Sequence, residues 1–159
     1  MRPASPQYGF TLLEFVTVIV VIGLLSVVVA MNTDILGASA RPQAEALRAH
    51  LRYTQSRALK SGQPWGLSCQ GDQCWLFSGN NPGSTADRRP LPGEDGLLVN
   101  LVDKGVTITA FNLIFDAYGV PHSSSATPLA TALAVTVQSR KDAADSASLT
   151  VIPQTGYVQ

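Results

Sequence analysis

Two cysteines are the residues whose type and spacing most readily suggest chemistry. Cys69 and Cys74 have four residues between them, a spacing that fits a redox pair, half of a metal site or a small disulfide loop. A redox pair normally has two intervening residues at the start of a helix, and the segment around Cys69 lacks that arrangement. The choice depends on the compartment in which the cysteines lie, and therefore on the N-terminus of the chain.

Other candidates for catalysis or metal binding are few. The two histidines, His50 and His122, have no cysteine or aspartate partner at metal-ligand spacing. The three serines after His122 lack the Gly-x-Ser-x-Gly frame of a hydrolase, and the chain contains no phosphate-binding or dinucleotide-binding glycine pattern. Asp142 and Asp145 do not form a calcium loop. We therefore expect a protein that is not an enzyme, with no catalytic residue, cofactor or metal.

Length and charge bound the function further. The chain has 159 residues, enough for one domain of ordinary size plus an appendage. Lysine and arginine number 11 and aspartate and glutamate number 11, so the formal net charge is zero. A neutral chain has no general attraction for nucleic acid, so DNA is not an expected partner.

The longest apolar segment lies near the N-terminus, at residues 10–31, and Glu14 is its one charged residue. A helix of this length spans about 33 Å, enough to cross a hydrocarbon core of about 30 Å. A carboxylate inside a membrane span costs on the order of 2.5–3.5 kcal/mol. The sequence therefore predicts a transmembrane helix whose glutamate needs a partner that the neighbouring residues do not supply.

The segment from Gly9 to Glu14, Gly-Phe-Thr-Leu-Leu-Glu, resembles the prepilin cleavage motif of type IV pilins and type II secretion pseudopilins. The resemblance implies that prepilin peptidase removes a leader, residues 1–9, after Gly9 and that Phe10 is then N-methylated. It also implies that Glu14 pairs with the terminal amine of a neighbouring subunit during filament assembly. Such an amine has a pKa of roughly 7.7–8.0 and is largely protonated at neutral pH.

Two other interpretations of the N-terminus compete with prepilin processing. One is a plain membrane anchor that is never cut. The other is a secretory signal peptide cleaved after the Ala-Ser-Ala sequence at 38–40. The apolar run exceeds the usual 7–15 residues of a signal peptide, and Glu14 interrupts it. Flanking charge is a weak guide, because Arg2 precedes the span but Arg41 and two further arginines follow it.

After the span, residues 32–62 are predicted to continue as a helical spine. Pro42 can stand in the first turn of a helix, and Gly62 followed by Pro64 ends it. Small and apolar residues recur at steps of three and four on one face: Ala44, Leu47, Leu51, Thr54 and Ala58. This face is expected to pack on a sheet, and the basic residues around it are expected to be solvated.

Residues 63–159 are predicted to form a head of about seven short antiparallel strands. The expected strands are 65–69, 74–77, 97–102, 106–110, 113–115, 133–137 and 149–152. Residues 78–96 and 122–131 are expected to be loops. The fold class is therefore α+β, and the resemblance implies the pilin-like form: a long N-terminal helix, transmembrane in its first half, packed on an antiparallel sheet.

The first two strands are expected to form a hairpin whose tip is closed by Cys69 and Cys74. The resemblance places the head outside the cytoplasm, where such cysteines are oxidised. A structural disulfide is therefore favoured over free thiols and over a redox or metal site.

Two segments of the head are similar to the GspH/FimT group of minor pseudopilins and pilins. These are residues 52–62, which resemble an Arg-x-x-Ala-Ile-Lys-x-Gly segment, and residues 115–121, which resemble Phe-x-x-x-Gly-x-Pro. The resemblance implies a minor pseudopilin of type II protein secretion, held in the bacterial inner membrane by one span, with a cytoplasmic N-terminus and a periplasmic head. Its implied partners are prepilin peptidase and other pseudopilins or pilins. The alternative is a minor pilin of a type IV pilus, involved in pilus priming or DNA uptake.

Overall fold

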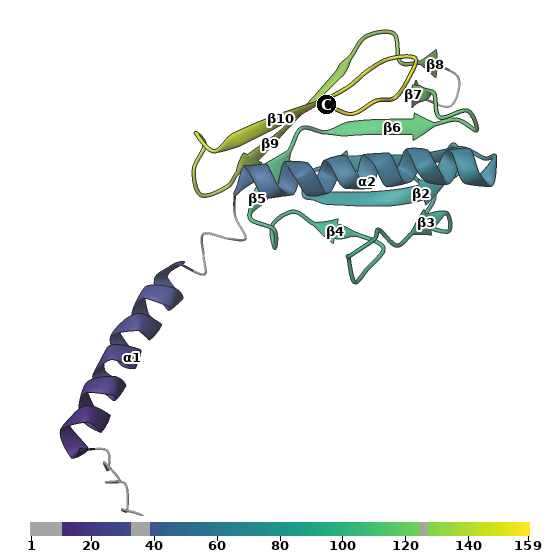
Figure 1. Cartoon of the computed structure of the whole chain (residues 1–159). Helices are drawn as coiled ribbons and strands as arrows, with labels where there is room; N and C mark the ends of the chain where they lie inside the picture. Colours follow the sequence, from purple (N-terminus) through teal and green to yellow (C-terminus); the bar gives the residue numbers. More distant parts are fainter. Residues whose placement is uncertain (1–10, 33–38, 125–126) are drawn as a thin grey trace, which may run out of the picture. The chain divides into compact units, whose positions relative to one another are not determined.

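The computed structural model describes residues 11–32, 39–124 and 127–159. The chain divides into two compact units, residues 1–36 and residues 37–159 (Figure 1). The described residues of the first unit form helix α1 (Leu12–Asn32). The second contains helix α2 and all the described strands. We call this whole unit the head, which includes α2 as well as the predicted β-rich head at 63–159.

Helix α2 (Ala40–Ser61) has the ends and the buried face expected from its sequence. Its first N–H, on Ala40, donates to the Oδ2 atom of Asp145 at 3.0 Å. Pro42 lies in the first turn, where a missing N–H costs no helical hydrogen bond. At the other end Gly62 has φ of 64°, a left-handed conformation that glycine adopts without strain, and its N–H donates to the Ala58 carbonyl at 3.0 Å. The buried residues include all five predicted from the helical spacing.

The larger sheet has the strand order β3-β2-β1-β6-β7-β8, and β4 also pairs with β2. All its pairings are antiparallel. The strands are β1 (Trp65–Gln70), β2 (Gln73–Ser78), β3 (Arg88–Arg89), β4 (Val99–Asn100), β6 (Phe111–Phe115), β7 (Pro121–Ser124) and β8 (Thr127–Pro128).

The smaller sheet has the order β10-β9-β5 and is also antiparallel. Its strands are β5 (Val106–Ile108), β9 (Leu133–Ser139) and β10 (Ser146–Val151). Buried and exposed residues alternate along β9, as expected for a sheet with one solvated face. The C-terminal segment folds back onto β10, where Val158 forms a bridge with Val151.

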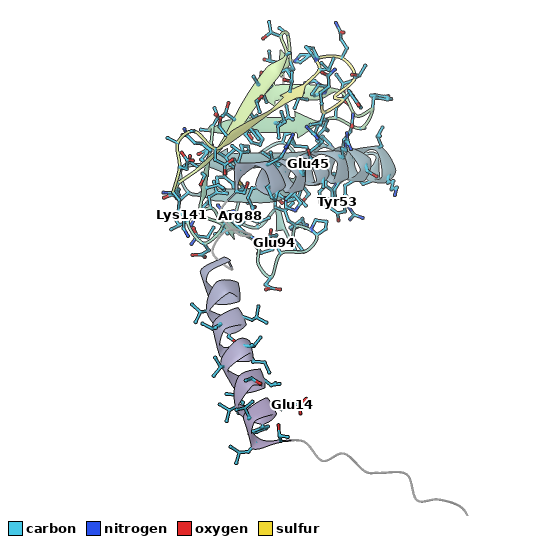
Figure 2. All side chains as sticks on the ribbon, turned by 60° about the vertical axis from the view of Figure 1, so that its left-hand side comes forward. Glu14, Glu45, Tyr53, Arg88, Glu94 and Lys141 are labelled. Carbon is cyan, nitrogen blue, oxygen red and sulfur yellow. A yellow bond between two sulfur atoms is a disulfide. The ribbon has the colours of Figure 1, made fainter. Side chains whose placement is uncertain are left out.

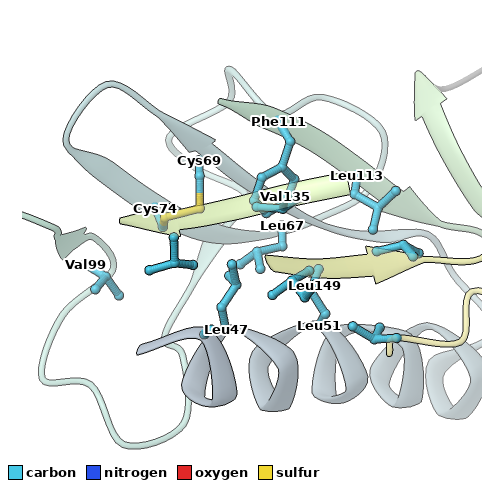
Figure 3. Packing of buried hydrophobic residues seen from close by; sticks show 14 of the residues in the cluster. Leu47, Leu51, Leu67, Cys69, Cys74, Val99, Phe111, Leu113, Val135 and Leu149 are labelled. Atoms are coloured by element: carbon cyan, nitrogen blue, oxygen red, sulfur yellow. A yellow bond between two sulfur atoms is a disulfide. The ribbon is translucent and has the colours of Figure 1, made fainter. Parts of the chain in front are cut away.

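The main core lies between α2 and the inner faces of both sheets. Figure 3 shows Leu47 and Leu51 of α2 directed toward strand residues such as Leu67, Val135 and Leu149. Leu51, Leu67 and Val135 are completely buried. Full burial of one such side chain contributes roughly 1.5–3 kcal/mol, so this contact fixes α2 on the sheets.

A second apolar cluster lies on the other face of the larger sheet and consists of Trp75, Phe77 and Ile114. Trp75 donates through Nε1 to the Pro82 carbonyl at 2.8 Å, and Arg88 stacks over its ring at 4.9 Å. Gly66 lies beneath the Phe77 ring, and a Cβ atom there would be 2.2 Å from Phe77 Cζ. The segment after β2 therefore covers this face, which explains why β1 and β2 are buried on both sides.

Several predicted strand boundaries in the head are wrong. The described head has two sheets and ten strands, β1–β10, rather than about seven. Of 97–102 only Val99–Asn100 is a strand, because the side-chain oxygen of Asn100 accepts from the Val102 N–H at 3.0 Å and turns the chain. The predicted loops contain short strands, β3 within 78–96 and most of β7 and all of β8 within 122–131. Their pairings are set by neighbouring strands and not by local apolar spacing.

Candidate assembly site

Glu14 lies in the first turn of α1 (Figure 2). Thr11 caps this end of the helix. The N–H of Glu14 donates to the Thr11 side-chain oxygen at 3.2 Å, and the Thr11 carbonyl accepts from the N–H groups of Glu14 and Phe15. A threonine followed three residues later by glutamate is the sequence signature of a capping box, and the sequence analysis missed it. A carboxylate at this end also interacts favourably with the helix dipole. The first turn is therefore capped by Thr11, and the Glu14 side chain is exposed.

Helix α1 exposes apolar side chains on all its sides. The exposed fraction is 83% for Leu12, 54% for Ile19 and 65% for Leu24, and every described side chain from 11 to 27 is exposed. Its two hydroxyl side chains donate to carbonyls of the same helix, Thr17 to Glu14 at 2.8 Å and Ser26 to Ile22 at 2.7 Å. A helix that is apolar all round needs lipid or protein around it, and these hydroxyls are already satisfied for such surroundings.

Other predictions for the N-terminus stay untested. Within the part of the chain that the structure describes, no helix combines the length and hydropathy required of a membrane span. Gly9 and Phe10, the predicted cleavage and methylation residues, lie outside the described residues. The transmembrane segment at 10–31 therefore remains a prediction from the sequence.

The predicted disulfide between Cys69 and Cys74 is present. The two residues lie directly opposite each other in the β1–β2 hairpin, and their Cα atoms are 4.1 Å apart. Their exposed fractions are 1% and 4%, and both belong to the main core with Leu47 and Val99 (Figure 3). The disulfide therefore joins β1 to β2 from inside the core, where it is shielded from reagents in solution.

The two histidines lie in different parts of the head. His50, on α2, has its Nε2 atom 3.3 Å from the Pro92 carbonyl. Burial lowers the pKa of His50, while the Pro92 carbonyl and Glu94 raise it to a smaller extent. His122, on β7, has Nε2 3.3 Å from Asp116 Oδ2. Among the described residues no three potential ligands of the His, Cys, Asp or Glu type are grouped to hold a metal.

Most of the basic residues of α2 are exposed to solvent, as predicted, and two of them also make contacts within the head. Arg52 donates to the Val158 carbonyl at 3.1 Å and lies over the Tyr157 ring at 5.9 Å. Arg57 lies over the Trp65 ring at 4.8 Å. These arginines hold the C-terminal segment and the start of β1 against the helix, an arrangement that no local sequence signal indicates.

Comparison with known proteins finds a family and a similar fold. Residues 43–155 match the model of the family described as Type II transport protein GspH. No curated protein matches the chain. Among solved structures, the chain is similar to the minor pseudopilin EpsH from the Type 2 Secretion System of Vibrio cholerae. That match has 13% sequence identity and a TM-score of 0.52, and it covers 76% of this chain and 94% of the other.

The structural match shows a shared fold, and the family match covers most of the chain, including most of α2 and all ten described strands. The expected α+β fold, with a helix packed on an antiparallel sheet, and the resemblance to minor pseudopilins are thereby confirmed. The chain belongs to the GspH family of type II transport proteins.

Proposed function

We propose that this chain is a minor pseudopilin of a type II protein secretion system, cut after Gly9 by prepilin peptidase and assembled with other pseudopilins into a pseudopilus that drives export of folded proteins. Before assembly, the N-terminal helix would anchor the chain in the inner membrane with the head in the periplasm. The observation that carries the proposal is α1 itself, a helix apolar on all sides with Glu14 in its first turn. The membership of the chain in the GspH family supports the same role.

The proposed mechanism uses α1 twice. Lipid covers its apolar side chains before assembly, and neighbouring helices cover them afterwards, so the apolar contacts are kept throughout. Glu14 would meet the methylated amine of Phe10 on the next subunit. Such an ion pair offsets the burial of both charges and fixes how far one subunit is displaced along its neighbour.

Processing is tested by intact mass and N-terminal sequencing of the full chain from membranes of its native host. The expected product begins at Phe10 and carries one added methyl group, and it is missing from a host without prepilin peptidase. A chain that begins at Met1 would make the protein a plain anchor, and one that begins at Arg41 would make it a secreted protein. Either result would overturn the proposal.

Assembly is tested with two matched variants of Glu14. Glu14→Gln keeps the size of the side chain and loses its charge, so we expect normal cleavage but loss of the chain from purified pseudopili and loss of secretion in a deletion strain. Glu14→Asp keeps the charge and should retain partial function. Full secretion by Glu14→Gln would show that the carboxylate does not act in assembly.

A further inference from the structure

Strand β10 lies at the edge of the smaller sheet, and half of its outer side is paired with the C-terminal segment. Thr150 exchanges two backbone hydrogen bonds with Gln159, at 3.2 and 2.9 Å, and the Ile152 N–H donates to the Tyr157 carbonyl at 2.9 Å. Along a strand, the backbone N–H and C=O groups of successive residues point alternately to one side and to the other. The even-numbered residues of β10 therefore direct their N–H and C=O groups away from β9.

Ser148 and Ser146 are the next outward-facing residues along this edge. Ser148 lies opposite Thr136, whose backbone groups bond to Thr109 on the far side of β9, so this pair exchanges no hydrogen bond. Within the described parts of the chain, the backbone groups of Ser146 and Ser148 form no hydrogen bond outside the β9–β10 ladder. Both residues are exposed, and neither a proline nor a lysine protects this part of the edge.

A groove with a volume of about 440 Å³ separates this edge from the first turns of α2. Its strand side consists of residues 145–148, and its helix side consists of Arg41, Ala44, Glu45 and Arg48. Asp145 also binds the start of the helix, because its Oδ2 atom accepts the Ala40 N–H. The groove therefore presents outward-facing main-chain groups on one wall, and on the other the side chains of Arg41 and Arg48, the latter paired with the Glu45 carboxylate.

The arginines leave donors unused. Arg48 donates through one terminal nitrogen to Glu45 at 2.6 Å, but its Nε atom is buried without a partner. Arg41 is exposed and has no ion pair with any described residue. A ligand that satisfies the groove must supply alternating backbone donors and acceptors for the serines and a carboxylate for the arginines.

We propose that this groove binds an extended, acidic segment of another pseudopilin, which adds a strand to the edge of β10 at Ser146 and Ser148 and directs a carboxylate at Arg41 and Arg48. Main-chain hydrogen bonds give such strand addition its affinity, and side-chain contacts give it specificity. The inference rests on the proposed function, because it takes its partner from the same filament.

The test uses the full chain in its native host, with a photo-crosslinking amino acid at Ser148. Gln138 is the control position, because it is exposed but lies on the central strand β9. We expect an adduct with another pseudopilin, identified by mass spectrometry, from position 148 and none from position 138. Arg41→Glu should abolish the adduct, whereas Arg41→Lys should retain it.

A second pair of variants tests main-chain recognition. Ser146→Pro removes the outward N–H, and Ser146→Ala keeps it while removing the hydroxyl group, so the adduct should be lost only with proline. If the proline variant does not fold, Arg41→Glu still tests the inference. This variant is expected to fold, because acidic residues are favourable in the first turn of a helix. An absent adduct, an adduct with another class of protein, or an adduct unaffected by Arg41→Glu would overturn the inference.

Failure of this inference can be told apart from failure of the proposed function. If the unmodified chain is processed and restores secretion while these variants behave like it, the groove has no role and the function stands. If the unmodified chain is not processed, the proposed function fails first.

Discussion

The guanidinium group of Arg140 is bonded to the carboxylate of Asp72, and this contact joins the end of β9 to the tight turn between β1 and β2. Arg140 also donates through Nε to the Val106 carbonyl at 2.9 Å, while the Asp72 carbonyl accepts the Leu101 N–H at 2.8 Å. The two side chains are 33% and 54% exposed. The pair therefore links the two sheets at a site that water reaches.

We expect Asp72→Asn to lower the free energy of unfolding by about 1 kcal/mol or less, because exposed ion pairs contribute little. Arg140→Ala should cost more, since it also removes the hydrogen bond to Val106, typically worth about 0.5–1.5 kcal/mol. Urea unfolding of the detergent-solubilised chain measures both values. Equal losses for the two variants would show that the Val106 contact contributes nothing.

Gly66→Ala is expected to destabilise the head by about 1–3 kcal/mol, because the new methyl group would overlap the ring of Phe77. Gly83→Ala is the matched control, since its nearest neighbour would be 3.4 Å from the new Cβ. Thermal unfolding followed by circular dichroism compares the two variants. Similar midpoints would mean that Phe77 moves aside without cost.

Replacing both Cys69 and Cys74 with alanine should lower the free energy of unfolding by about 2 kcal/mol, the value expected from closure of so short a loop. The native disulfide should also resist dithiothreitol until the head opens, because both cysteines are buried. Mass spectrometry after thiol alkylation follows this reduction over time. Rapid reduction under native conditions would contradict the placement of the bond inside the core.

Stability should fall on acidification through His50. Burial lowers the pKa of His50 below its ordinary value of 6.5, with Lys104 adding to the effect and Pro92 and Glu94 opposing it. Between pH 6.5 and the lower pKa of the folded state, the unfolded chain therefore binds more protons than the folded chain. The free energy of unfolding decreases as the pH falls through that interval. His50→Gln should reduce this dependence in urea unfolding curves. An unchanged dependence would assign it to other groups.

Much of the fold could be predicted because local signals were strong. The helical spacing from Ala44 to Ala58 located the buried face of α2, and the Gly62 signal located its end within one residue. The cysteine spacing around a turn indicated the hairpin and its disulfide. In each case a pattern within a few residues determines the structure.

Long-range contacts could not be predicted in this way. The two-residue strand β3 depends on pairing with β2, and its sequence, Arg-Arg, carries no strand signal. The outward-facing groups of Ser146 depend on which residues pair with β9, and strand register is a property of the whole sheet. The groove at β10 was therefore invisible in the sequence, although Thr11 and Glu14 carried a capping signal that could have been found.

The bond between the Ala40 N–H and Asp145 has a consequence for the order of folding. The two residues are 105 positions apart in the sequence. The first turn of α2 therefore gains this partner only after the segment that connects β9 to β10 has been synthesised and has packed against it. Gln55 likewise binds carbonyls at Gly119 and Thr155, which emerge late. Contacts between residues so far apart in the sequence slow folding, because a long loop must close, at a cost in entropy, before the contact can stabilise the structure. While the chain is emerging, the apolar face of α2 stays uncovered, and during this interval the head is most open to proteolysis and aggregation.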